Sequence, residues 1–130
     1  MTKVFIDGSA GTTGLQIHQR LALRSDIQLL TLPENLRKDP TARADLLNQA
    51  DIAFLCLPDQ AAIEAAELVE NPHTCIIDTS TAHRVAPDWV YGFPELGWAE
   101  QIAKAGRIAN PGCHATGFIS IVYPLVQMGL

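Results

Sequence analysis

The sequence predicts an α/β fold with a Rossmann-like, doubly wound and mainly parallel sheet. Three observations predict it. Short apolar, β-branched segments alternate with helix-like segments, one of the apolar segments (DIAFLCLP) is apolar at nearly every position, and no repeat or low-complexity linker interrupts the alternation. Alternation of this kind places helices on both faces of a parallel sheet, so the strands are apolar on both sides. A chain of 130 residues is long enough to bury the core of one domain.

Five strands are predicted from short β-branched and aromatic runs that end at turn residues. They lie within residues 3–7, 27–33, 51–58, 74–80 and 107–110. Where two such strands are parallel and follow each other, the connection between them must cross over, and a helix is the usual crossover.

Helices are predicted where apolar residues return at helical spacing, within residues 15–25, 41–50, 60–70 and 94–104, and again after Cys113. Asp59 is expected to cap the third of them. The last segment, FISIVYPLVQMGL, is apolar on nearly every face, and Pro124 removes one N–H from its helical ladder. A helix of this composition normally has a partner that buries it all round, so we expect the sequence to be the front part of a longer protein.

The composition excludes several classes of function. The net charge is −5 and there is no basic run, so nucleic acid is not an expected partner. No secretory signal and no apolar run of bilayer length is visible, so we expect neither membrane insertion nor export. Three widely spaced cysteines fit neither a disulfide framework nor a zinc site, which favours a cytoplasmic protein without a metal.

The carboxyl ends of parallel strands meet at one edge of a sheet, and ligands of doubly wound folds bind in the crevice there. This rule brings four loops together: residues 8–14, 58–59, 79–84 and 110–113. We therefore expect the functional site to be made from these loops.

The loop after the first strand, GSAGTTG, has three glycines spaced by three residues, close to the G-x-G-x-x-G fingerprint of dinucleotide-binding proteins. Such a loop needs a tight turn, close approach of the backbone to a pyrophosphate, and close helix packing. N–H groups at the start of the following helix would point at the phosphates, and hydroxyls could add donors. The residues expected to contact the dinucleotide are Gly8, Ser9, Gly11, Thr12, Thr13 and Gly14. The alternative is that the glycines serve the turn alone.

Sequence spacing leaves the choice between NAD and NADP open. Glu34 lies 20 residues after Gly14, where an acid would hold the ribose 2′-hydroxyl of NAD. Arg37 and Lys38 follow and could instead bind the 2′-phosphate of NADP.

Cys113 is the candidate nucleophile. It ends a strand and begins a helix, where the helix dipole and free N–H groups favour the thiolate. Pro111 and Gly112 shape the turn before it. The alternative is a buried cysteine at a helix start, and Cys56 and Cys75, which lie in strand patterns, are expected to be inert core residues. A nicotinamide and a reactive thiol together predict attack on an activated acyl group followed by hydride reduction to an aldehyde.

No histidine is an evident base for this thiol. His114 is adjacent to Cys113, but neighbouring helical residues point about 100° apart, so adjacency is poor support for a pair. His18, His73 and His83 are expected at the surface or in loops, without the company of metal ligands.

Four motifs, GSAGTTGLQI, IIDTSTAHR, WVYGFPEL and IANPGCHATG, resemble in kind and order those of the N-acetyl-γ-glutamyl-phosphate reductase family of arginine biosynthesis, in its shorter form. The resemblance spans essentially the whole chain. It implies NADPH as cofactor and attack of Cys113 on the acyl phosphate of N-acetyl-L-glutamyl 5-phosphate, with phosphate and N-acetyl-L-glutamate 5-semialdehyde as products.

The resemblance also implies roles for residues outside the glycine loop. Ser80 and Pro58 would flank the cofactor, and Pro111 and Gly112 would lie near the nicotinamide. By analogy with the related aspartate-semialdehyde dehydrogenases, Arg84 would bind the substrate phosphate. The alternative for Arg84 is an ion pair with Asp78 or Asp88.

The family pattern continues beyond this sequence. Residues 1–112 correspond to a NADP-binding domain without its returning C-terminal segment, and residues 113–130 lead into an α+β substrate and dimerisation domain that the sequence does not contain. The family's acid/base histidine belongs to that domain, so we expect residues 1–130 alone to be inactive and the full-length protein to form a homo-oligomer. The alternatives are another phosphorylating semialdehyde dehydrogenase, of the aspartate or N-acetylaminoadipate type, and a non-catalytic nucleotide-binding domain.

Overall fold

The computed structural model describes residues 1–130, which form one sheet of six strands with every neighbouring pair parallel. The strands are β1 (Thr2–Asp7), β2 (Ile27–Leu30), β3 (Ile52–Leu55), β4 (Cys75–Asp78), β5 (Val90–Tyr91) and β6 (Arg107–Ala109). Their order across the sheet is β2-β1-β3-β4-β6-β5. The predicted α/β class with a doubly wound parallel sheet is confirmed.

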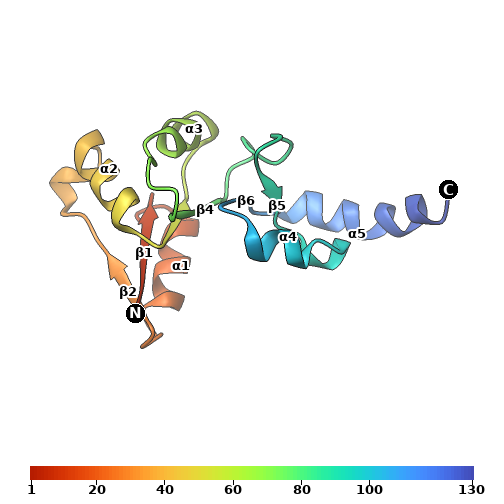
Figure 1. The fold of residues 1–130 in the computed structure, drawn as a ribbon, viewed down its shortest axis with the longest axis horizontal. Coiled ribbons are helices and arrows are strands. Elements are labelled where there is room, and N and C mark those ends of the chain that lie inside the picture. The colour runs from red at the N-terminus through yellow and green to blue at the C-terminus, as the bar shows by residue number, and fades with distance from the viewer.

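Helices cover both faces of this sheet. They are α1 (Thr12–Leu21), α2 (Pro40–Gln49), α3 (Asp59–Glu67), α4 (Ala99–Lys104) and α5 (Cys113–Gln127), with short 3₁₀ turns η1 (Glu34–Leu36) and η2 (Pro94–Leu96). Figure 1 shows α2 and α3 on one face and α1 and α4 on the other. β2 pairs with one side of β1, and β3 pairs with the other side. The direction in which strands are added to the sheet therefore reverses between β1 and β3.

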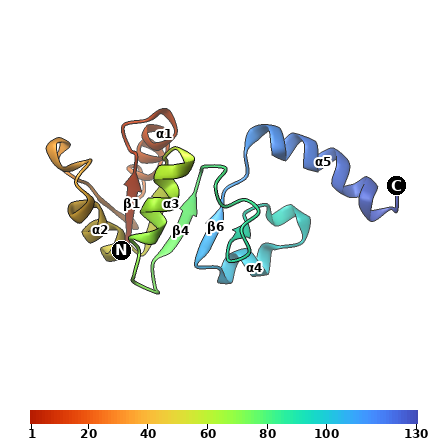
Figure 2. The same ribbon diagram turned by 90° about the horizontal axis from the view of Figure 1, so that it is seen from above.

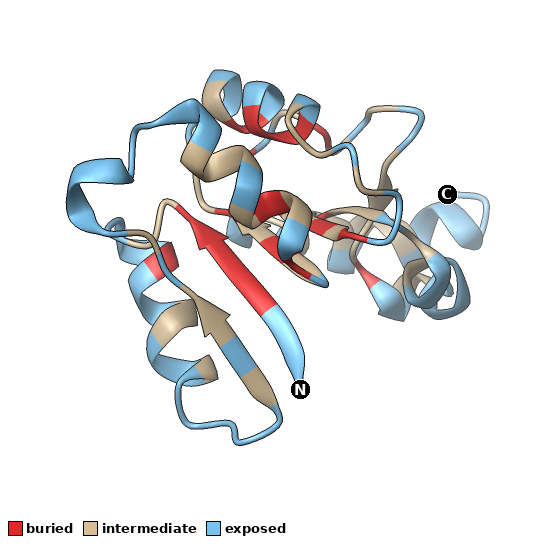
Figure 3. Ribbon diagram, turned by 60° about the vertical axis from the view of Figure 1, so that its left-hand side comes forward, coloured by how far each residue is buried: buried red, intermediate tan, exposed pale blue.

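The main core lies between the sheet and the face covered by α2 and α3. Its buried members are Phe5, Leu47, Ala50, Ala53, Leu55, Ala65, Ala66 and Ile76. The buried residues of α3 are all alanines, Ala62, Ala65 and Ala66, and the buried segments in Figure 3 follow the central strands and the inner faces of the helices. The core therefore holds the central strands firmly, and with them the loops at their carboxyl ends.

Three predicted details of the elements are wrong. The segment 94–104 is not one helix, because Gly97 adopts a left-handed φ of +88° and separates η2 from α4. β5 was not predicted; it has only two residues, which pair with Ile108 and Ala109 of β6. Asp59 is not the N-cap, because Pro58 occupies that position without a capping side-chain bond and α3 begins at Asp59 itself.

Helix α5 begins at the sheet and extends away from it, as Figures 1 and 2 show from two directions. None of its residues is buried, and Phe118 and Ile121 are 67% and 70% exposed. A hydrogen bond from the Tyr123 hydroxyl to the Leu96 carbonyl (3.3 Å) ties it to η2. None of the helices combines the length and apolar character that crossing a bilayer requires.

Candidate functional site

Four consecutive strands of the sheet, β1, β3, β4 and β6, end at the edge where the candidate residues lie. Gly8 follows β1, Pro58 follows β3, Ser80 follows β4, and Cys113 follows β6 after a turn of three residues. All four strands are parallel, so these residues share one edge. Three strand spacings separate the first from the last, about 14 Å. The four loops that we expected to converge are thus neighbours along one edge of the sheet.

The glycine loop is packed too closely for side chains at two of its three glycines. Gly8 has a left-handed φ of +86°, and a Cβ there would lie 2.2 Å from the carbonyl oxygen of Cys56. A Cβ on Gly14 would lie 2.3 Å from the carbonyl oxygen of Gly8. At Gly11 the nearest atom would be 3.5 Å away, an ordinary contact. The loop therefore lies directly against Cys56, the residue that follows β3, and against the start of α1.

The first turn of α1 has free hydrogen-bond donors. Gly11 is its N-cap and supplies no side-chain acceptor. The N–H groups of Thr12, Thr13 and Gly14 donate to no acceptor of the chain, whereas the Leu15 N–H donates to the Gly11 carbonyl at 2.9 Å. Free N–H groups at a helix start bind anions, with the helix dipole in support. This geometry fits the pyrophosphate of a dinucleotide.

A cleft of about 760 Å³ adjoins the glycine loop and reaches the segment after β2. The loop contributes Gly8, Ser9 and Ala10, the segment after β2 contributes Thr31, Glu34, Asn35, Arg37 and Lys38, and the start of α3 contributes Ala61. Both predicted determinants of the ribose site, the acid and the two cations, therefore lie in the wall of one cleft. The volume is of the size that cofactor pockets have.

An ion pair between two largely buried side chains, Asp7 and Arg43, forms part of the lining of this cleft. The Asp7 carboxylate, at the end of β1, accepts hydrogen bonds from the Arg43 guanidinium at 2.8 and 3.1 Å. Both side chains are largely buried, at 6% and 18% exposed. The Arg43 guanidinium compensates the charge of the Asp7 carboxylate, which immediately precedes Gly8. The sequence contains no evident signal for this ion pair.

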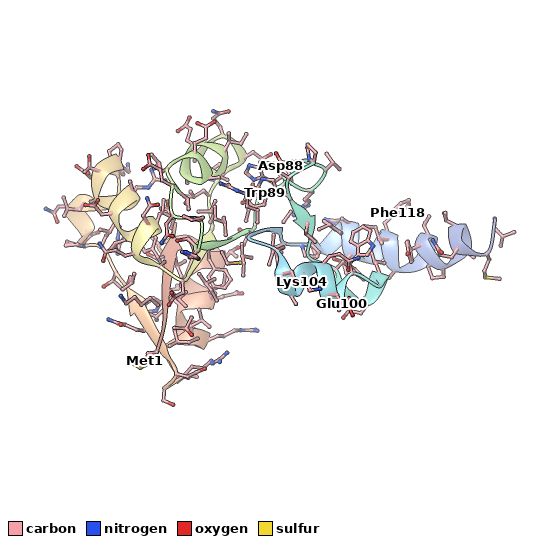
Figure 4. All side chains as sticks on the ribbon, viewed as in Figure 1. Met1, Asp88, Trp89, Glu100, Lys104 and Phe118 are labelled. Atoms are coloured by element: carbon pink, nitrogen blue, oxygen red, sulfur yellow. The ribbon has the colours of Figure 1, made fainter.

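The loop after β4 is organised by another buried carboxylate. Asp78 is fully buried and accepts hydrogen bonds from the Ser80 N–H (2.9 Å) and the Ser80 hydroxyl (2.7 Å). The His83 Nδ1 lies 2.6 Å from the same carboxylate, and the His83 ring stacks on Trp89 with centroids 3.9 Å apart. Figure 4 labels Trp89 on the connection between β4 and β5. His83 thus lies in a loop, one of the two locations predicted for it, but it is buried there and not at the surface.

Asp59 joins the loops after β3 and β4. Its carboxylate accepts hydrogen bonds from the Thr81 hydroxyl and from the Thr81 N–H, the latter at 2.9 Å. These bonds, the hydroxyl first, lower the pKa of Asp59 below its ordinary value. Pro58 and Ser80 are held in adjacent loops by this link.

Arg84 points to the turn that precedes the thiol. A Cβ built on Gly112 would lie 2.7 Å from both terminal nitrogens of Arg84, so the guanidinium lies directly over this glycine. Arg84 forms no ion pair with Asp78 or Asp88, and its Nε is buried without a partner. The alternative of an ion-paired loop arginine is therefore wrong. The cation is instead available beside the N-terminus of α5.

Cys113 is the first residue of α5 and is exposed. The N–H groups of Cys113, His114 and Ala115 donate to no acceptor of the chain, and Gly112 supplies no side-chain cap. The His114 Nδ1 lies 3.6 Å from the Cys113 Sγ, although adjacent helical residues normally diverge. The alternative of a buried cysteine is wrong for Cys113.

The other two cysteines differ from Cys113. Cys56 and Cys75 are partly buried, and burial raises the pKa of both thiols, so they are poor nucleophiles. No group of three or more His, Cys, Asp or Glu side chains converges on a possible metal site.

Comparisons with known proteins give two kinds of similarity. The family model described as "Semialdehyde dehydrogenase, NAD binding domain" matches residues 24–105. N-acetyl-gamma-glutamyl-phosphate reductase of Burkholderia cenocepacia is 60% identical over 129 residues, and N-acetyl-gamma-glutamyl-phosphate reductase 2 of Pseudomonas putida is 59% identical over the same length. Each covers 98% of this chain and 41% of the relative, so the chain spans about two fifths of the length of these curated relatives. The resemblance carried by the four motifs is confirmed.

Solved structures share the fold at much lower identity. Aspartate semialdehyde dehydrogenase from Francisella tularensis superposes with a TM-score of 0.69 at 16% identity, over 100% of this chain and 42% of that one. The enzyme from Candida albicans with NADP gives 0.66 at 17% identity, over 98% of this chain and 47% of that one. At these identities the similarity establishes the fold alone.

Proposed function

The chain belongs to the semialdehyde dehydrogenase family through its NAD-binding domain, and from this premise we propose that it is the cofactor-binding and thiol-bearing part of an NADPH-dependent acyl-phosphate reductase. The substrate is N-acetyl-L-glutamyl 5-phosphate, and the products are N-acetyl-L-glutamate 5-semialdehyde and phosphate. The observation that carries the proposal is the placement of an exposed thiol at the N-terminus of α5, on the same sheet edge as the glycine loop.

The cofactor is held at the glycine loop and the adjoining cleft. The free N–H groups of α1 bind the pyrophosphate, and Gly8, Gly11 and Gly14 let it approach the backbone. Arg37 and Lys38 in the cleft wall favour a 2′-phosphate, and therefore NADPH over NADH. Pro58, Ser80, Pro111 and Gly112 follow along the sheet edge toward the thiol. The chemistry that a bound reduced nicotinamide supplies is hydride donation to an acyl carbon.

The thiol performs the first step. The Cys113 thiolate attacks the carbonyl carbon of the acyl phosphate, and an S–C bond forms while the carbonyl oxygen becomes an oxyanion. The oxyanion collapses, the C–O bond to phosphate breaks, and inorganic phosphate leaves a thioester on Cys113. The dipole and free N–H groups at the start of α5 favour both the thiolate and the oxyanion. The His114 Nδ1 lies 3.6 Å from this sulfur, and we assign the acid/base role to the histidine of the substrate domain.

Arg84 supplies positive charge for the phosphate. Its guanidinium lies over Gly112 without a carboxylate partner, so its donors are available to a phosphate near Cys113. A guanidinium matches the geometry of phosphate oxygens in two parallel hydrogen bonds. We assign the substrate phosphate to this residue.

The proposal divides the chain into two functional parts. Residues 1–112 bind the cofactor, and residues 113–130 carry the thiol and lead into a substrate domain with the acid/base histidine. The whole protein is a cytoplasmic homo-oligomer that acts on a small molecule, and residues 1–130 alone do not turn over, because the nucleophile and its acid/base partner must act together.

Turnover of the whole protein tests the chemistry. We expect phosphate-dependent reduction of NADP by N-acetyl-L-glutamate 5-semialdehyde, little or none by aspartate semialdehyde, and loss of the activity in Cys113→Ser. Full activity in Cys113→Ser would refute the thioester step. A preference for aspartate semialdehyde would replace the proposed substrate while leaving the thiol chemistry in place.

Cofactor binding is tested on residues 1–130 without turnover. The midpoint of thermal unfolding should rise more with NADPH than with NADH, and Arg37→Ala with Lys38→Ala should remove the difference. Glu34→Ala is the matched control from the same cleft wall, and it should leave the preference for NADPH intact. An equal rise with both nucleotides in the unsubstituted chain would refute the assignment of the 2′-phosphate.

A further inference from the structure

The loop after β4 contains a buried assembly that the thiol chemistry does not use. It consists of Asp78, Ser80, His83 and Trp89, and it ends at the residue next to Arg84. We propose that His83 is a positioning residue for Arg84: anchored to Asp78 and Trp89, it holds the guanidinium over Gly112 beside the reactive thiol. This inference rests on the proposed function, because it assumes that Arg84 binds the substrate phosphate.

The anchor is strong because its central carboxylate is fully buried. Asp78 accepts two hydrogen bonds from Ser80 and has His83 Nδ1 at 2.6 Å, so three donors surround a group with no access to water. A buried carboxylate that loses one of these donors is destabilised, so the loop has little freedom to change its path. The Ser80 hydroxyl also accepts the Ala82 N–H at 3.2 Å, which fixes the residue before His83.

The second attachment of His83 is its ring. The imidazole stacks on Trp89 at 3.9 Å with the two planes 13° apart, and the Arg107 guanidinium carbon lies 5.6 Å from the centre of the Trp89 ring. His83 is therefore fixed both by its nitrogen and by its face. Two attachments define the direction of the backbone at this point, and Arg84 is the next residue.

No ion pair or hydrogen bond holds the Arg84 side chain in place. Its buried Nε has no hydrogen-bond partner. Its position over Gly112 depends on the backbone that His83 anchors and on the absence of a side chain at Gly112. A packed side chain without a hydrogen bond takes its position from its backbone and its packing, so a shift of the backbone moves the guanidinium with it. The anchor therefore decides whether the cation faces the thiol.

Substitutions at His83 can separate the anchor from simple space filling. His83→Phe keeps a ring to stack on Trp89 but removes the donor to Asp78. His83→Asn keeps a donor near the position of Nδ1 but removes the ring. If His83 only fills space, His83→Phe should be the milder change; if it anchors Arg84 through Asp78, His83→Asn should be the milder one.

The experiment measures protection of Cys113 in the whole protein. Alkylation of Cys113 by iodoacetamide is followed by mass spectrometry of its peptide at increasing inorganic phosphate, without cofactor. Bound phosphate should slow alkylation, and Arg84→Gln should abolish the effect. In His83→Phe we expect half-protection to need about tenfold more phosphate, the loss typical of a misplaced charge-assisted hydrogen bond. His83→Asn should stay close to the unsubstituted protein.

Each other result has a defined meaning. Protection that is lost in Arg84→Gln but unchanged in His83→Phe overturns the positioning role and leaves the proposed function standing. Protection that is absent from the unsubstituted protein, or unchanged in Arg84→Gln, removes Arg84 from the proposed function and the inference with it. If His83→Phe does not fold, His83→Leu replaces it: this change also removes the donor to Asp78, and protection there equal to that in His83→Asn overturns the inference.

Discussion

Replacing Gly8 by alanine tests how closely the glycine loop is packed against β3. The new Cβ would lie 2.2 Å from the Cys56 carbonyl oxygen, a backbone atom that cannot turn away, and the residue would keep a φ of +86°. The left-handed conformation costs alanine about 1 kcal/mol. Separating the two backbone segments adds about 1–3 kcal/mol. We therefore expect Gly8→Ala to lower the free energy of unfolding by about 2–4 kcal/mol.

Gly97→Ala is the matched control. Gly97 has nearly the same φ, +88°, but no atom lies within 4 Å of a Cβ built on it. This substitution should lower the free energy of unfolding by about 1 kcal/mol, the conformational cost alone. Urea unfolding followed by circular dichroism measures both values, with equal slopes required for the comparison. A loss in Gly8→Ala no larger than that in Gly97→Ala would refute the close contact between the glycine loop and β3.

Three further changes test other parts of the structure. Arg43→Ala leaves the Asp7 carboxylate buried without its cation and should lower the free energy of unfolding by about 3 kcal/mol, with partial recovery when Asp7→Asn is added; no recovery would contradict the charge argument. Thr81→Val should raise the pKa of Asp59 in an NMR titration, because the hydroxyl that lowers it is gone. The stability that this lowered pKa contributes is present at pH values above the pKa of Asp59 in the unfolded state, and it is lost as the pH falls through the pKa in the folded state. The variant should therefore be less stable than the unsubstituted protein at pH values above the unfolded-state pKa. An unchanged pKa of Asp59 would contradict the hydrogen bond from the Thr81 hydroxyl. Iodoacetamide should label Cys113 before the two other cysteines, whose burial raises their thiol pKa, and the order of labelled peptides in mass spectrometry decides this.

Every strand except β5 was predicted, because each of the others has an apolar run that ends at turn residues. β1, β3 and β4 lie in the middle of the sheet, so burial alone selects their residues. β5 could not be predicted in this way, because its two residues become a strand only by pairing with β6, which follows later in the chain. The break at Gly97 was also missed, since a glycine within a helical pattern does not by itself distinguish a weak helix position from a left-handed end.

The positions of the candidate site residues followed from one topological rule, and their contacts did not. The rule placed Gly8 and Cys113 on one edge because parallel strands end together. The burial of His83 was missed, although a signal was present: an aspartate ends a buried strand, and such a carboxylate needs donors nearby in the chain. The contact of Arg84 with Gly112 joins residues 28 positions apart, and no local pattern reports it.

The direction of α5 has a mechanical consequence. With 15 residues the helix is about 22 Å long, so a tilt of about 10° about its first residue displaces the far end by about 4 Å. The sulfur sits at the pivot of this lever and barely moves. A segment or domain that packs against the far end of α5 can therefore move by several ångströms while the Cys113 sulfur stays at its position beside the sheet.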